Sequence, residues 1–176
     1  MNYVIRNNYE LKTGEKTAIS QLLVDCFAQY PNQRIHLKQC PSFRLLVYDD
    51  QNLIAHLAVD YRYMNNSGQL ISIFGLSDVC VLPAYRSQKI ATKMIEKISK
   101  IAQDQAIDFL ILIAWDMDIY LSMGFQQVTN TCRWLIIHQD QSLGLAQRQI
   151  PDGLMVKSLS NQLWGEKLVD FMGPIF

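Results

Sequence analysis

The sequence has no excess of either charge. Its 176 residues include 16 Lys and Arg against 16 Asp and Glu, so the formal net charge is zero. A protein that binds nucleic acid through its phosphates normally has a basic surplus, and this balance argues against that class. Charged residues make up only 18% of the chain and hydrophobic residues 49%, which is typical of a folded domain.

Long apolar runs are also missing. The longest, residues 109–115, is far shorter than the roughly 20 apolar residues that a membrane-spanning helix needs. The first residues, MNYVIRNNYELKTGEK, contain no apolar segment of the length found in secretory signal peptides. We therefore expect no membrane partner and a cytoplasmic location.

Cysteines are few and far apart, and no pair has the spacing of a metal site, so we expect no bound metal. Free thiols in a reducing compartment are the expected state without a secretion signal. Internal repeats and linkers are absent as well, and a chain of this length fits a single domain, residues 1–176. The cysteines are Cys26, Cys40, Cys80 and Cys132.

The most informative segment that the sequence does contain is 76–102. It begins as an apolar strand, which Pro83 ends because proline has no N–H group to donate to a neighbouring strand. A basic, polar turn at 85–89 follows. Apolar residues then recur at spacings of three and four, from Ile90 to Ala102, which predicts an amphipathic helix.

A turn of this kind at the start of a helix is suited to binding phosphate. The first amides of a helix have no partner within it, and the helix dipole places partial positive charge there. Arg86 and Lys89 add full charges, while Ser87 and Gln88 add side-chain donors. From the turn alone, an ordinary strand-to-helix connection with two solvated basic residues is the simpler interpretation.

The remaining segments predict an α/β (α+β) fold. The apolar run at 108–114 suits a strand covered on both faces and parallel to its predecessor through the helical crossover. Gly75, inside a predicted strand, indicates a bulge or a close approach of another group. We expect a central mixed, mostly antiparallel sheet with one parallel βαβ pair and helices on both faces. The expected elements are strands at 3–5, 43–48, 53–63, 69–82, 108–114, 125–128, 132–138 and 154–159, helices at 13–30 with Thr13 as N-cap, 33–39, 90–102 and 116–123, a polar loop at 139–149, and a helix or tail at 162–171.

The run VCVLPAYRSQKIA at 79–91 resembles motif A of the GCN5-related N-acetyltransferases (GNAT family), roughly V-x-V-x-P-x-x-R-x-x-G-x-G/A. The resemblance implies a GNAT-type fold in which loop amides hold the pyrophosphate of acetyl-coenzyme A. Lys89 stands where the family usually has glycine; it gives up glycine's close backbone approach but brings a charge.

The coenzyme-binding residues follow from this resemblance. The backbone around Cys80 would pair with the pantetheine arm like an added strand. Cys80 itself is expected to pack rather than act as a nucleophile, because family members transfer the acetyl group directly. The residues implied are Val79, Cys80 and Val81 along pantetheine, and Arg86, Ser87, Gln88, Lys89, Ile90 and Ala91 around the pyrophosphate.

The segment YLSMGF at 120–125 resembles the Y-x-x-x-G-F segment of the same family. The resemblance implies that Tyr120 protonates the departing thiolate, a sensible role for a phenol that is fully protonated at neutral pH. The alternative is a half-buried tyrosine that packs its ring under the sheet.

A base is needed because an ammonium must lose a proton before it attacks. Asp78 is the first candidate, and Ser77, a candidate substrate contact, should face the opposite way because strand residues alternate. His56 has a suitable ordinary pKa, although a lone histidine on an apolar strand is more often a satisfied core residue. Asp116 and Asp118 are explained by capping of a helix.

Two further segments resemble the aminoglycoside 2'-N-acetyltransferases: IAHLAV at 54–59 and VDFMGPIF at 169–176. They make Asp170 and Phe176 candidate substrate-binding residues. Aminoglycosides are polycations that need an acidic cleft, and this chain has no acidic excess, so a less charged amine or amino sugar is an alternative acceptor.

The sequence therefore predicts an enzyme that moves an acetyl group from acetyl-coenzyme A directly to a primary amine of a small molecule. We expect this enzyme to have no nucleic-acid partner. Lys89 and the absence of an obvious strong base leave two alternatives: a non-catalytic acyl-coenzyme A sensor or interaction domain, and an N-acyltransferase for longer chains. A homodimer is left open.

Overall fold

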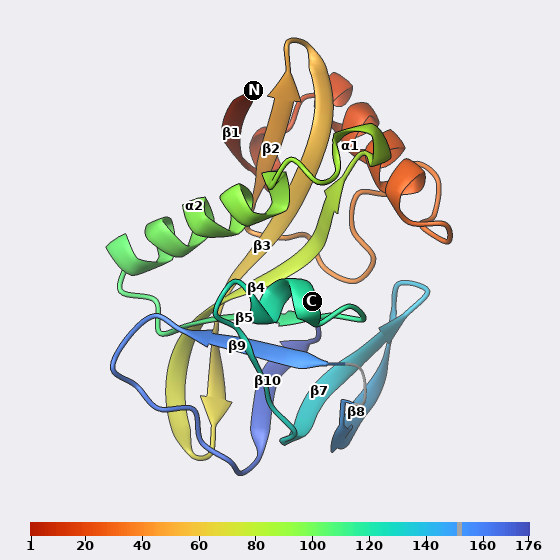
Figure 1. The fold of residues 1–176 in the computed structure, drawn as a ribbon. Helices are drawn as coiled ribbons and strands as arrows, with labels where there is room; N and C mark the ends of the chain where they lie inside the picture. Colours follow the sequence, from red (N-terminus) through yellow and green to blue (C-terminus); the bar gives the residue numbers. More distant parts are fainter. Residues whose placement is uncertain (151–152) are drawn as a thin grey trace.

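A long antiparallel meander forms the centre of the molecule in the computed structural model, which describes residues 1–150 and 153–176 (Figure 1). It consists of β2 (Phe43–Asp49), β3 (Asn52–Asn66) and β4 (Gln69–Val81). Ser67 and Gly68 join β3 to β4 with positive φ angles of 56° and 95°, the backbone that a tight hairpin turn requires. The predicted meander is confirmed.

The described residues place ten strands in one sheet, in the order β6-β9-β5-β4-β3-β10-β7-β8; β2 pairs with the first part of β3, whose end pairs with β10, and β1 pairs with β2. The pair β4 and β5 is parallel, as the crossover predicted. A second parallel pair, β10 with β7, was not predicted. The other strands are β1 (Asn2–Asn7), β5 (Phe109–Ile113), β6 (Gln126–Gln127), β7 (Thr131–His138), β8 (Gln141–Gln149), β9 (Leu154–Ser158) and β10 (Val169–Pro174).

Helices α1 (Thr13–Cys26) and α2 (Ile90–Asp104) cover opposite faces of the meander (Figure 1). On β2, Leu46 packs with the apolar face of α1, while Leu45 and Val47 pack with that of α2, because neighbouring strand residues point to opposite faces. The expectation of helices on both faces is confirmed. The short α3 (Asp118–Leu121) and the 3-10 turns at Asn8–Glu10 and Pro83–Tyr85 complete the elements.

The first helix is shorter than predicted. Thr13 is its first residue rather than its N-cap; Lys12 is the N-cap, and its backbone N–H donates to the Glu15 carboxylate at 2.9 Å. The helix ends at Cys26, and the predicted helix at 33–39 is wrong. A polar helix of that length has little to stabilise it, and the carbonyl of Ile35 instead accepts a hydrogen bond from Arg44 at 2.6 Å.

Two predictions for the second half of the chain are also wrong. The predicted loop at 139–149 contains β8, an exposed edge strand whose only large apolar residues, Leu143 and Leu145, are themselves exposed. Gln139 and Asp140 both adopt positive φ and allow the tight turn from β7. The predicted helix or tail at 162–171 contributes to β10, which lies between β3 and β7.

Gly75 of β4 does permit a close approach, from an aromatic ring. A β-carbon built on Gly75 would lie within 2.4 Å of two ring atoms of Phe176. The Arg62 guanidinium carbon lies 5.4 Å from the centre of the same ring. Among the described helices, none is long and apolar enough to cross a membrane.

Replacing Gly75 with alanine should therefore displace the Phe176 ring and destabilise the fold by about 1–3 kcal/mol, the usual cost of overpacking a filled site. The measurement is the free energy of unfolding from urea denaturation. Gly14→Ala is the control: nothing lies within 4 Å of that position in α1, so this change should stabilise by about 0.5–1 kcal/mol. Equal effects of the two changes would contradict the packing of Phe176 on Gly75.

Candidate functional site

The site begins at an irregularity in β4. Two residues of β4, Asp78 and Val79, lie opposite the single residue Leu57 of β3, since the register passes from Ala58–Ser77 to His56–Cys80. Asp78 has a left-handed backbone, with φ of 50°. Such a bulge bends its strand. The pairing of β4 with β5 ends just before it, at Leu76 and Leu112, and the two strands then separate.

Three adjoining cavities follow this separation. The loop cavity, of about 670 Å³, lies against the start of α2; the fork cavity, of about 580 Å³, lies between the diverging strands; and the inner cavity, of about 190 Å³, lies beyond Asp78. Val79 and Tyr120 line both the loop and fork cavities. Ser77 and Asp78 line both the fork and inner cavities, so the three form one groove.

The loop before α2 has the backbone shape that glycine usually supplies. Ser87 and Lys89 adopt positive φ angles of 64° and 57°, and Lys89 is the N-cap of the helix. Lysine thus occupies a left-handed position that glycine takes at lower cost. Residues 86–89 are exposed, and Arg86, Ser87, Lys89, Ile90 and Ala91 line the loop cavity, whereas Gln88 does not.

The middle of the loop cavity is bounded by residues 79–81 of β4. The Arg86 side chain folds back over this strand, and its Nε donates to the Val81 carbonyl at 3.2 Å. Cys80 is buried; a hydrogen bond with Cys26, followed by burial, raises the pKa of its thiol. A thiol that stays protonated is a poor nucleophile, which agrees with a packing role.

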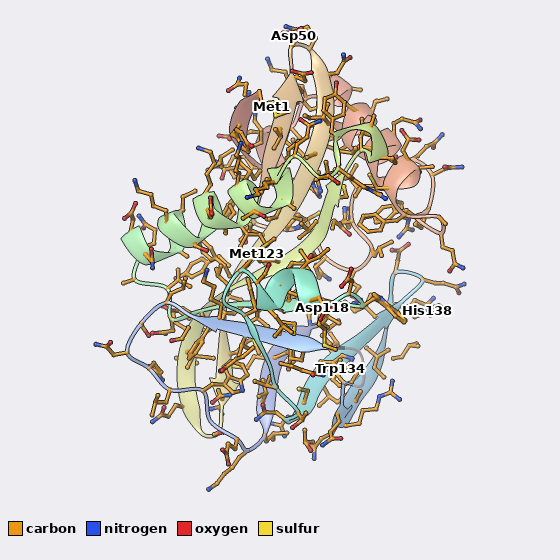
Figure 2. All side chains as sticks on the ribbon, in the orientation of Figure 1. Met1, Asp50, Asp118, Met123, Trp134 and His138 are labelled. Carbon is orange, nitrogen blue, oxygen red and sulfur yellow. The ribbon has the colours of Figure 1, made fainter. Side chains whose placement is uncertain are left out.

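Tyr120 lies in α3 and lines both the loop and fork cavities; Figure 2 labels Asp118, the first residue of α3, and Met123, which follows the helix. Its ring is half-buried and meets the Phe125 ring edge-on, with the centres 5.9 Å apart. Burial, followed by the charge of Asp116, raises the pKa of Tyr120. The phenol is therefore protonated at neutral pH and able to donate a proton into the groove.

Asp78 lies at the junction of the fork and inner cavities. Its Oδ2 accepts a hydrogen bond from the Tyr30 hydroxyl at 3.1 Å. Burial raises the pKa of Asp78, and the Tyr30 hydrogen bond and the Arg44 charge only partly oppose it. Ser77 lines the same two cavities, as does the preceding Leu76. The opposite orientation of the Ser77 and Asp78 side chains stays a prediction.

His56 lies behind the bulge and lines none of the three cavities. It is fully buried, with Nε2 accepting from Arg44 at 2.8 Å and Nδ1 donating to the Asp78 carbonyl at 3.0 Å, a tautomer inferred from these partners. Burial and the nearby Arg44 lower the pKa of His56 to about 3. It is therefore neutral, and it holds the backbone of Asp78.

Of the two candidate substrate-binding residues near the C-terminus, Asp170 and Phe176, only Phe176 lines the groove. Asp170 of β10 accepts hydrogen bonds from Arg133 at 3.0 and 2.5 Å and lines none of the three cavities. Burial alone would raise the pKa of Asp170, but the bonds from Arg133 and the Met172 N–H outweigh it and lower that pKa. Phe176 does line the inner cavity, beside Arg62.

Several residues that line the groove were not singled out from the sequence as site residues. Tyr30, Leu37 and Lys38 come from the irregular segment between α1 and β2, and Trp115 follows β5. The length of the 27–42 segment was an available signal, since long connections without secondary structure are often functional. Only the fold shows which of its side chains face the groove.

Comparison with known proteins agrees with this geometry. Residues 9–128 match the family model of the acetyltransferase (GNAT) domain. Over 64 residues, 34% of the chain, the sequence is 36% identical to a thialysine N-epsilon-acetyltransferase from Bos taurus; the match spans only 38% of that enzyme's length.

Solved structures show the same fold. The GNAT family N-acetyltransferase YhbS from Escherichia coli, in complex with CoA, is 16% identical, with a TM-score of 0.62 over 96% of this chain and 88% of that one. ElaA from Escherichia coli is 18% identical, with a TM-score of 0.63 over 90% of this chain and 100% of that one. With a family model matched from α1 to β6 and a groove opened by two diverging parallel strands, the chain belongs to the GNAT acetyltransferase family.

Proposed function

We propose that the protein is an acetyl-coenzyme A-dependent N-acetyltransferase that transfers the acetyl group directly to a primary amine of a small molecule. The observation that carries the proposal is the continuous groove. It joins a basic loop at a helix start to a cleft in which a half-buried carboxylate, Asp78, and a protonated phenol, Tyr120, line adjoining walls.

The residues present fit coenzyme A. The α2 N-terminus offers unpaired amides, with Arg86 and Lys89 beside them, which suits a pyrophosphate. Beyond Leu76, the β4 edge that faced β5 pairs with no strand in the part of the chain that the structure describes, and it is available to an extended arm such as pantetheine. The named residues for these roles are those of the loop, 86–91, and Val79, Cys80 and Val81.

The bound coenzyme would supply the acetyl thioester. In this proposal, Asp78 accepts a proton from the acceptor ammonium, directly or through water, and its raised pKa makes it a better base than an ordinary aspartate. Tyr120 gives its phenolic proton to the departing sulfur. His56, itself bonded by Arg44, holds the Asp78 backbone from behind, and neither residue lines the loop, fork or inner cavity.

Two classes of acceptor amine are considered, amino sugars and amines of the lysine type. The C-terminal and β3 segments favour an amino sugar or an aminoglycoside, and the named relative acts on the N-epsilon group of thialysine. An acyl-coenzyme A sensor would bind the coenzyme without turnover in a wide amine screen, and a longer-chain acyltransferase would prefer longer acyl donors. Thiol release measured with an amine panel and an acyl-length series separates these three functions.

We predict that Tyr120→Phe lowers kcat by about 100-fold, because the sulfur then leaves without a proton donor. The measurement is thiol release from acetyl-coenzyme A with the best amine of the panel. The affinity for acetyl-coenzyme A should stay within about twofold, since the ring is kept. Tyr9→Phe, at an 83% exposed position, is the control and should leave kcat unchanged. Full kcat in Tyr120→Phe would remove the acid role.

For Asp78→Asn we predict a fall in kcat/KM of at least about tenfold and a change in the pH profile. Burial raises the pKa of Asp78, so the base is lost as the pH falls through that raised value. The wild-type acid limb should therefore report one proton more than the variant's limb. An acid limb of unchanged slope in Asp78→Asn would assign the base to another group. Thermal denaturation of both proteins at each pH excludes unfolding as the cause.

Comparing two replacements of Lys89 distinguishes the effect of its charge on binding from the effect of its left-handed backbone on stability. Lys89→Gly should raise stability by about 1 kcal/mol, because glycine takes the left-handed position at no steric cost, whereas Lys89→Ala should not. Both variants lose the exposed charge and should bind coenzyme A about two- to fivefold more weakly at low salt. Calorimetric titration and thermal unfolding measure the two effects. Unchanged affinity in both variants would show that only the loop amides and Arg86 hold the phosphates.

A further inference from the structure

The inner cavity carries both signs of charge. Its walls include Lys38 from the segment between α1 and β2, Asp60 and Arg62 from β3, and Asp78 from the bulge of β4. Two bases and two acids thus face one small space, which adjoins the fork cavity through Ser77 and Asp78. No acidic excess is present among these charged wall residues, although a polycationic acceptor would need one.

Three of these four charges are already engaged. Arg62 lies 3.5 Å from the Asp60 carboxylate, and its Nη1 donates to the Pro174 carbonyl at 2.5 Å. Asp78 accepts the hydrogen bond from Tyr30. Lys38 makes no ion pair and no hydrogen bond within residues 1–150 and 153–176, although its side chain is half-buried.

A half-buried ammonium without a partner is costly, and burial lowers the pKa of Lys38 accordingly. Burial likewise raises the pKa of Asp78. Each charged form would therefore gain from an opposite charge brought by a ligand. The two residues line one cavity, so a single small molecule with both charges satisfies both.

We propose that the acceptor is a small zwitterion, an amine that also carries a carboxylate, as an amino acid does, with its ammonium at Asp78 and its carboxylate at Lys38. This inference rests on the proposed function and names its substrate class. The inner cavity, of about 190 Å³, accommodates a carboxylate and a short stem but not a multi-ring polycation. Lys38 acts here as a specificity-determining residue.

The fork cavity suggests which amino acids to test first. Phe27, Leu37, Trp115 and Ile119 line it, and all four are exposed, Trp115 by 88%. An apolar or aromatic side chain of the acceptor would cover part of this surface and gain burial energy. The acceptor panel therefore includes aromatic as well as basic compounds.

The experiment compares matched amines that differ only in the carboxylate: phenylalanine with phenethylamine, and lysine with cadaverine. Kanamycin represents the aminoglycosides. For the wild-type protein, we expect kcat/KM to favour the carboxylated member of at least one pair by about tenfold or more, the usual effect of a charge-assisted hydrogen bond. Lys38→Met should reduce that preference to about twofold or less, chiefly through KM, and Lys38→Arg should restore part of it.

Lys93→Met, on the exposed side of α2, is the matched control and should keep the preference. Equal or better use of the decarboxylated amines or of kanamycin by the wild-type protein would overturn the zwitterion while leaving the acetyltransferase intact. So would a preference that survives in Lys38→Met. Coenzyme A binding without acetylation of any amine would instead overturn the proposed function, and this inference with it.

Discussion

The left-handed backbone of Asp78 is the constraint on which the rest of the groove depends. It inserts one extra residue into β4, and the pairing of β4 with β5 stops just before that residue. A regular β4 would continue beside β5 and close the fork cavity. Asp78, within the bulge, also lines the fork and inner cavities, so one backbone irregularity opens the groove and supplies its carboxylate.

A buried polar network holds this irregular backbone in place. Arg44 is fully buried, and its guanidinium donates to Asn8 at 3.1 Å, to His56 at 2.8 Å and to the carbonyl of Ile35 at 2.6 Å. His56 then donates to the carbonyl of Asp78. Burying an arginine is costly, and here its donors are used to join the bulge to the segment that carries Tyr30 and Lys38. The two walls of the inner cavity are thus held by one side chain.

In the loop before α2, a lysine side chain is combined with a backbone conformation that glycine usually supplies. Lys89 takes the left-handed conformation expected of glycine, which leaves the helix amides presented to the loop cavity. The left-handed backbone of Lys89 is strained because lysine has a β-carbon, and its side chain adds a positive charge beside Arg86. The departure from the family motif is therefore in the residue type, while the backbone takes a left-handed conformation that glycine adopts readily.

Local patterns in the sequence determined most of the helices and strands and located the loop cavity of the groove. Apolar periodicity gave the meander, α2 and the parallel β5, and the motif at 79–91 with Tyr120 located the loop cavity. The tertiary structure alone decided the rest. Strands β8 and β10 exist because partners distant in sequence pair with them, so their own residues carry little signal. The left-handed bulge at Asp78 was not predicted, His56 proved to lie in the interior, and Lys38 came to line the same cavity as Asp78 only through folding. Spacing along a chain fixes which face a residue shares with its neighbours, whereas a cleft is formed by segments whose distance in space no local pattern encodes.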